Sequence, residues 1–177
     1  MSKAVLISLH PEWCEKIING QKTIEVRKTR PKMNPPFKCY IYRSVQGGVI
    51  GEFVCDHIFE RIVRVGASCE APKYCICDWN MDCTPLDTLL ADACLTKDEL
   101  EKYLDGGVGY GWHISNLKIY DTPKELIEFH TWKKCKSCNK SGYESTACIY
   151  DENCIIPAAI TKAPQSWCYV EEEIWND

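Results

Sequence analysis

Short apolar runs separated by turn signals alternate along much of the chain, and they predict more strands than helices. The runs "KAVLISL" (3–9), "FKCYIYRS" (37–44) and "VIGEFVCDHIFERIVRV" (49–65) have the length and the β-branched and aromatic content of strands. The Gly-Gly pair at 47–48 predicts that the last two form an antiparallel hairpin. The long second arm is typical of a strand that bends around a small barrel.

Helical periodicity predicts three helices between these strands. In "HPEWCEKIING" (10–20), Pro11 suits the first helical position and Gly20 suits the left-handed residue after the end. In "TPLDTLLADACLTKDELEKYL" (84–104), Thr96 and Glu99 have the spacing of a capping box. A short capped helix is expected at "DTPKELIEF" (121–129).

The segment "KTIEVR" (22–27) predicts a strand that carries three charged side chains. Strand alternation places Glu25 and Arg27 on one face and Lys22 on the other. The three therefore share a pocket only if the chain is still turning at residues 21–22, which Gly20 favours. An exposed ion pair with a solvated lysine is the alternative.

Two further strands complete the predicted fold. "YGWHISNLKIY" (110–120) alternates Trp112 with His113, and "SWCYVEEEIW" (166–175) closes the sheet. The expected fold class is α+β, a small mixed β-barrel with peripheral short helices. We expect one domain over residues 1–177, with irregular insertions at about 66–95 and 131–163.

Charge is distributed unevenly along the sequence. The net charge of −4 argues against a broad surface for nucleic acid. Residues 1–43, however, hold nine Lys and Arg against three acidic residues, a balance of +6, and the remaining chain carries −10. This asymmetry indicates a local electropositive site, suited to a phosphate or a short strand rather than a long duplex. A solvated basic face is the alternative.

Thirteen cysteines, an odd number, are scattered from Cys14 to Cys168. The N-terminus shows no long apolar run, and nowhere do about 18 apolar residues follow one another. We therefore expect a soluble, cytoplasmic protein with reduced thiols and no membrane contact.

The insertion "CKSCNKSGYESTACIYDENC" has a spacing that can supply four thiolates to a structural zinc ion, with free thiols or a disulfide as the alternatives. The candidate ligands are Cys135, Cys138, Cys148 and Cys154. An earlier group is spaced too irregularly to predict a metal site with equal force; it consists of Cys69, Cys75, Cys77 and Cys83.

The stretch "SLHPEWCEKIINGQKTIEVRKTR" (8–30) resembles the ASCH domain family, within the PUA-like superfamily. It fits that family's pattern of Pro-x-Trp, a helix and then Gly-x-Lys-x-x-Glu-x-Arg, with Gly20, Lys22, Glu25 and Arg27 at the four positions. The segments "VIGEFVCDHI", "YGWHISNLKIY" and "PQSWCYVE" support the resemblance, which extends over 4–60, 108–129 and 164–173.

The resemblance implies a groove beside this motif that takes RNA or a nucleotide. Lys22 and Arg27 suit phosphate, and Glu25 suits an exocyclic amine. Trp13 and Trp112 can stack on a base, or can belong to the core. His113 is a candidate ligand contact or acid/base group, and Ser115, on the same strand face, is a further candidate ligand contact.

Similar proteins also include hydrolases. Some remove the acetyl group of N4-acetylcytidine with a Lys, a Thr and a Glu; Lys22 matches their Lys, but Glu25 stands where the Thr nucleophile is expected. Their Glu is not placed, because the candidates lie in a loosely aligned region; these are Asp87, Asp92 and Glu99.

A ribonuclease would instead use Lys22 to stabilise charge and His113 or Glu25 to transfer protons. Three hypotheses follow: a module that binds RNA or a nucleotide, a hydrolase acting on a modified nucleoside or RNA, and a protein-interaction module.

Overall fold

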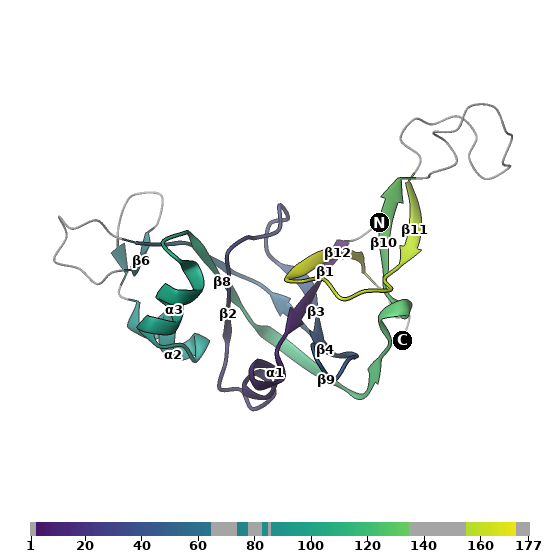
Figure 1. Ribbon diagram of the computed structural model, residues 1–177, viewed down its shortest axis with the longest axis horizontal. Coiled ribbons are helices and arrows are strands. Elements are labelled where there is room, and N and C mark those ends of the chain that lie inside the picture. The colour runs from purple at the N-terminus through teal and green to yellow at the C-terminus, as the bar shows by residue number, and fades with distance from the viewer. Residues whose placement is uncertain (1–2, 65–73, 78–82, 85, 135–154, 173–177) are drawn as a thin grey trace, which may run out of the picture.

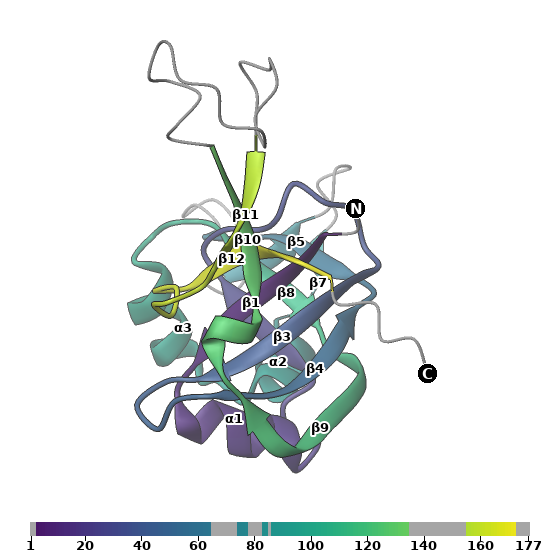
Figure 2. The same cartoon turned by 90° about the vertical axis from the view of Figure 1, so that its right-hand side faces the viewer.

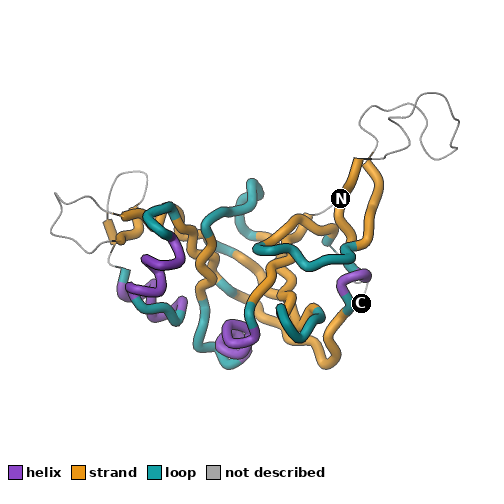
Figure 3. The backbone as a smooth tube through the Cα atoms, viewed as in Figure 1, coloured by secondary structure: helices purple, strands orange, loops and turns teal. Residues whose placement is uncertain are grey.

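Two five-stranded sheets, which continue into each other through two bent segments, form the body of the protein (Figure 1). The structure is a computed structural model that describes residues 3–64, 74–77, 83–84, 86–134 and 155–172. The predicted α+β class is confirmed: strands dominate and short helices lie at the periphery, as the tube in Figure 3 shows.

The strands of the first sheet are, in spatial order, β12 (Trp167–Glu171), β1 (Lys3–Leu9), β3 (Phe37–Arg43), β4 (Val49–Cys55) and β9 (Ser115–Lys124). The sheet is mixed, because β1 pairs parallel with β3 while the other three pairings are antiparallel. Figure 2 shows β3 and β4 at the front of this sheet, with β9 curving below them.

The second sheet is antiparallel throughout. Its order is β2 (Ile24–Arg27), β8 (Gly109–His113), β5 (Ile58–Arg64), β6 (Tyr74–Cys77) and β7 (Cys83–Thr84). A separate two-stranded ladder, β10 (His130–Lys134) with β11 (Ile155–Ala159), extends from the body beside the first sheet (Figure 1).

The two sheets are linked where strands bend from one into the other. Residues 56–57 alone separate β4 from β5, and Ile114 alone separates β8 from β9. The His113 N–H donates to the His57 carbonyl at 3.0 Å, so the two bends lie side by side. The predicted bend of the long arm is confirmed. The predicted barrel is corrected: among the described strands the ladders do not close, because no pairing joins the edge strands β12 and β9 of the first sheet, or β2 and β7 of the second, into a ring.

In the described part of the chain, three α-helices and one 3₁₀ turn cover this framework. They are α1 (Pro11–Ile18), α2 (Asp87–Ala93), α3 (Lys97–Leu104) and η1 (Leu126–Glu128). Helix α1 and the left-handed Gly20 (φ 71°) are as predicted. The helix predicted over 84–104 is two helices, because Cys94 is left-handed (φ 54°). Among the described residues, no helix has the length and apolar content needed to cross a membrane.

The prediction of a helix at 121–129 is wrong. Strand β9 continues through Lys124, which pairs with Val49, and only the single turn η1 follows. The predicted irregular insertions include regular elements as well: β6, β7 and α2 lie within 66–95, and β10 and β11 lie largely within 131–163.

Apolar clusters cover both faces of the first sheet, which explains the continuous apolar run of β1. On one face, Val5 and Ile7 pack with Ile17 of α1 and Trp112 of β8. A third cluster joins α2 and α3 to β2 through Ile24 and Val26. The opposite face of β2 therefore remains for Glu25 and Arg27.

Candidate functional site

The turn between α1 and β2 decides where the Lys22 side chain lies. The backbone N–H groups of Gln21 and Lys22 both donate to the Lys16 carbonyl, at 2.9 and 3.0 Å, so the chain is still turning there. Strand β2 begins only at Ile24. Because Lys22 precedes the strand, strict alternation does not apply to it, and its ammonium reaches the face that carries Glu25.

Glu25 lies between the two cations of the motif. Lys22 Nζ is 3.2 Å from Glu25 Oε2, and Arg27 Nε is 3.0 Å from Glu25 Oε1. The second contact is ionic, since the Nε–H is not aligned for a hydrogen bond. Lys22 Nζ also donates to the Ala93 carbonyl at the end of α2, at 2.7 Å. The three predicted residues therefore form one connected cluster, the Lys22–Glu25–Arg27 cluster.

This cluster is withdrawn from solvent. Lys22 is 3% exposed, Glu25 7% and Arg27 8%, and among the described residues these are the buried charged ones. Two cations and one carboxylate leave one positive charge without a buried partner. An exposed ion pair was the alternative for this motif, and the burial excludes it.

A cavity of about 640 Å³ opens beside the cluster. It lies between the start of α1, strand β2, helix α3 and the segment that leads into β12. Its walls are formed by Ser8, Leu9, His10, Trp13, Lys22, Glu25, Val26, Arg27, Ser44, Leu95, Glu99, Tyr103, Ala163, Pro164, Gln165 and Ser166.

Trp13 of α1 lines the cavity and is half-buried. Lys22 Nζ lies 4.9 Å from the centre of its ring, and Lys16 Nζ lies 4.6 Å from it. Both are cation–π distances. Trp13 also packs against the core cluster that contains Ile17. Trp13 therefore packs against the core and also lines the cavity.

Arg27 holds the opposite end of the cluster. Its Nη2 donates to the Ser8 carbonyl at 2.7 Å, and its Nη1 makes a longer contact of 3.3 Å with Ser166 Oγ. Tyr103 lies beside it, and burial raises the pKa of the Tyr103 hydroxyl, an effect that the Arg27 charge opposes. Arg27 therefore joins β2 to β1, to α3 and to the segment before β12.

Hydrogen bonds from β1 hold the segment 163–166 at the cavity wall. Ser8 Oγ donates to the Pro164 carbonyl at 2.7 Å, and the Ser8 N–H donates to the Ser166 carbonyl at 2.9 Å. Ser44 Oγ donates to the Leu9 carbonyl at 2.9 Å. The hydrogens of both hydroxyls are thus engaged, so Ser8 and Ser44 offer only acceptor oxygens to the cavity.

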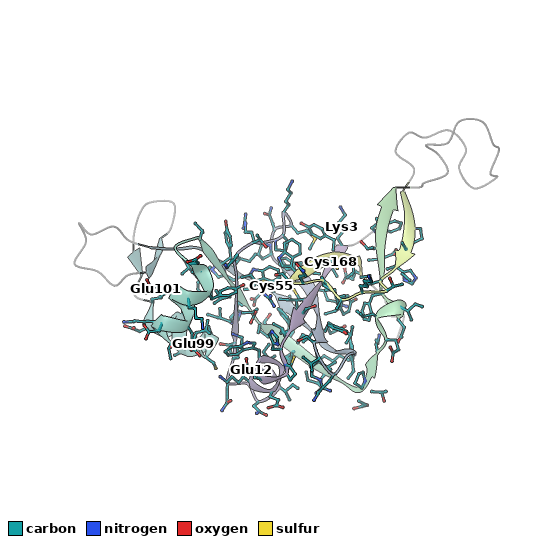
Figure 4. The ribbon with its side chains drawn as sticks, in the orientation of Figure 1. Lys3, Glu12, Cys55, Glu99, Glu101 and Cys168 are labelled. Carbon is teal, nitrogen blue, oxygen red and sulfur yellow. The ribbon has the colours of Figure 1, made fainter. Side chains whose placement is uncertain are left out.

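Glu99 is the second carboxylate of the cavity. Figure 4 shows it on α3, near the end of α1 that Glu12 marks. The predicted capping box is confirmed: Glu99 Oε2 accepts from the Thr96 N–H and hydroxyl, both at 2.8 Å. These hydrogen bonds lower the pKa of Glu99. Of the three acidic residues that remained candidates for the hydrolases' Glu, Glu99 lines the cavity and Asp87 and Asp92 do not.

Three predicted site residues lie elsewhere. Trp112 is fully buried in the core, between Phe37 and Trp167 with ring centres 5.9 and 5.8 Å away. His113 Nδ1 contacts Asp56 Oδ1 at 2.7 Å, and Ser115 Oγ donates to the Val54 carbonyl at 2.9 Å. None of the three lines the cavity.

Several cavity residues are absent from the sequence prediction. Tyr103 and the stretch 163–166 are brought to the site by long-range packing, and no local spacing marks them. The only signal was "PQSWCYVE", which supported the family resemblance without assigning a role to Ser166.

Five cysteines with described side chains are free thiols: Cys14, Cys39, Cys55, Cys94 and Cys168. Burial raises the pKa of Cys14 to about 11 and that of Cys55 to about 12. The four predicted zinc ligands in 135–154 lie outside the described residues. Within the part of the chain that is described, no group of three or more His, Cys, Asp or Glu is placed to hold a metal ion.

The mixed and antiparallel sheets form an α+β fold that solved structures share. ASCH from Zymomonas mobilis matches at 17% identity with a TM-score of 0.56, over 96% of this chain and 88% of that one. A variant with a tyrosine replaced by phenylalanine matches at 16% and 0.55, covering 96% and 91%. A variant with a serine replaced by alanine matches at 17% and 0.56, covering 96% and 89%. At these identities the likeness shows the fold alone.

The sequence itself shows the family. Residues 7–98, more than half of the chain, match the ASCH domain. The protein therefore belongs to the ASCH domain family, as its Gly-x-Lys-x-x-Glu-x-Arg motif predicted. A comparison with curated proteins finds no match.

Proposed function

We propose that the protein binds a nucleotide or a short single-stranded RNA segment in the cavity beside the Lys22–Glu25–Arg27 cluster. The observation that carries the proposal is the unmatched positive charge of this cluster at the wall of the cavity. A buried charge without a partner is costly, and an anionic ligand group would balance it. Membership of the ASCH family, for which RNA binding is generally proposed, agrees with this assignment.

The dimensions and aromatic lining of the cavity suit such a ligand. A volume of about 640 Å³ falls in the range of small-molecule sites and accommodates a nucleotide-sized group. Trp13 lines the cavity with Lys16 and Lys22 over its ring, and a base that displaced one of these ammonium groups would stack there, the usual way in which single-stranded nucleic acid is held. Glu25, Glu99 and the serine hydroxyls supply acceptors for base amines and ribose hydroxyls.

The direct test is binding measured by calorimetry with nucleosides, nucleotides and short single-stranded RNAs. Arg27→Gln removes the charge but keeps a polar side chain, and we expect affinity to fall about tenfold or more. Lys118→Ala is the control, since Lys118 is exposed on β9 and does not line the cavity. Melting temperatures verify that both variants are folded. Unchanged affinity of Arg27→Gln, or no binding to any member of the series, would overturn the proposal.

A hydrolase acting on a modified nucleoside such as N4-acetylcytidine, or on RNA, is the second candidate. It is favoured by one observation: Lys22 and Glu99, an ammonium and a carboxylate, line the same cavity. Opposing it, Glu25 replaces the expected threonine, and Thr23 does not line the cavity. Chromatography of the same protein–ligand mixtures distinguishes binding from hydrolysis. A reaction product that no longer forms with Lys22→Ala would establish catalysis.

A further inference from the structure

We infer that the cavity is matched to a single monoanionic phosphodiester, so that it takes an internal linkage of an RNA strand in preference to a terminal phosphomonoester. The inference rests on the proposed function and specifies its ligand.

The buried cluster requires one negative charge. Lys22 and Arg27 contribute two positive charges, and Glu25, held between them, contributes one negative charge. The Lys22 ammonium has three donors, and it contacts the Ala93 carbonyl, the Glu25 carboxylate and the Trp13 ring. Lys22 is therefore occupied by the protein, and the residual charge is available at Arg27.

Arg27 has a donor left for a ligand oxygen. Its guanidinium carries five N–H groups: one donates to Ser8, one makes a long contact of 3.3 Å with Ser166, and a further hydrogen bond joins the guanidinium to the Tyr103 side chain. The Nε–H is buried in ionic contact with Glu25 and is closed to a ligand. Arg27 lines the cavity while nine-tenths buried, so its remaining Nη hydrogen suits an oxygen of one phosphate.

A second negative charge on the phosphate meets no further lysine or arginine in the cavity wall. The lining includes two carboxylates, Glu25 and Glu99, against the cations Lys22 and Arg27, with the imidazole of His10 beside them. The Thr96 hydrogen bonds favour the ionised form of Glu99. Ser8 and Ser44 direct acceptor oxygens to the cavity, since their hydrogens are used by Pro164 and Leu9.

The phosphate chemistry separates the two ligand classes cleanly. A phosphodiester carries one negative charge at neutral pH, whereas a phosphomonoester, with a second pKa near 6, carries close to two. A methyl group on a nucleoside 5′-monophosphate converts one into the other with little change of size. The pair therefore isolates the effect of charge.

The test is calorimetry at about pH 7.5 and constant ionic strength with the four nucleoside 5′-monophosphates and their 5′-methyl phosphate esters. We expect each methyl ester to bind about tenfold more tightly than its parent, a difference of about 1.4 kcal/mol. Equal or tighter binding of the monoesters would overturn the inference alone. Absence of binding by both series would overturn the proposed function with it.

Two variants in one helix sharpen the test. Glu99→Gln removes the carboxylate charge at the cavity while a Gln can still serve in the capping box, so the preference for the methyl ester should narrow. Glu101→Gln, two residues along α3 and outside the cavity lining, is the matched control (Figure 4). The preference should stay unchanged in the control, and an equal narrowing in both variants would contradict the role of Glu99.

Discussion

Glu25 is the residue on which the arrangement of the site depends. It is the single buried carboxylate among the described residues, and each of its oxygens contacts a different cation. The anion keeps two like charges in one wall of the cavity. Glu25 also stands where the threonine nucleophile of the acetylcytidine hydrolases is expected.

The first prediction compares two substitutions in this cluster. Glu25→Gln leaves Lys22 and Arg27 buried without a counter-charge, and we expect it to cost about 3 to 5 kcal/mol of unfolding free energy. Lys22→Met leaves Glu25 paired with Arg27 and removes the unmatched charge, so its cost should be about 1 to 2 kcal/mol, mainly from the Ala93 carbonyl.

Urea unfolding of both variants measures the difference, with Lys118→Met as a control for the loss of a lysine at an exposed position. If Lys22→Met destabilises the protein as much as Glu25→Gln, the cluster is not organised around the carboxylate.

Sequence alone predicted the grouping of Lys22, Glu25 and Arg27, but not the position of Trp112. Alternation along β2 and the turn at Gly20 are local properties, so the grouping of these three residues could be predicted without tertiary information. Whether an aromatic residue faces a cavity or the core depends on what covers its strand. Trp112 is covered by Phe37 and Trp167, which are distant in the sequence.

At the scale of the elements, the two bends that link the sheets are held together by side chains as well as backbone. Asp56 follows β4 and His113 ends β8, and their contact of 2.7 Å spans the two bends. His113 is thus engaged in the framework, away from the cavity. Both side chains are partly exposed, 38% for His113 and 44% for Asp56, so the pair is screened by solvent.

The second prediction concerns pH. The hydrogen bond from His113, first among several causes, lowers the pKa of Asp56 below its usual value. A lowered folded-state pKa adds stability above the unfolded pKa, about 3.9, and this stability is lost as pH falls through the folded value. Asp56→Asn should therefore reduce stability at about pH 5.5, by less than about 1 kcal/mol in view of the exposure.

Urea unfolding of wild type and Asp56→Asn at about pH 5.5 and about pH 3 measures the effect. The difference in unfolding free energy between wild type and Asp56→Asn should be smaller at the lower pH. A gap that widens as pH falls would contradict the assigned role of the carboxylate.

Element prediction from sequence succeeded where local signals were strong. The capping box of Thr96 and Glu99 and the proline and glycine at the ends of α1 were sufficient to place helices. The failure at 121–129 has a tertiary cause: pairing of β9 with β4 extends the strand through Pro123, against local helical capping signals.

At the scale of the whole molecule, the basic N-terminal region and the acidic remainder come together at one cavity. Trp13, Lys22 and Arg27 come from the first third of the chain, Glu99 and Tyr103 from α3, and Ser166 from the segment before β12. Composition predicted a local electropositive site, but the contribution of the distant segments depends on topology. The predicted zinc site and the single-domain organisation stay predictions.

The measurement that tests the central claim most directly is a nuclear magnetic resonance titration of the ¹⁵N-labelled protein with a mixed-sequence single-stranded RNA tetranucleotide. The chain has six tryptophans, and the indole signal of Trp13 is identified with Trp13→Phe. We predict that this signal and the amides of residues 21–27, 163, 165 and 166 shift, while the buried indole of Trp112 does not. Shifts confined to β10 and β11, with Trp13 unchanged, would contradict the account.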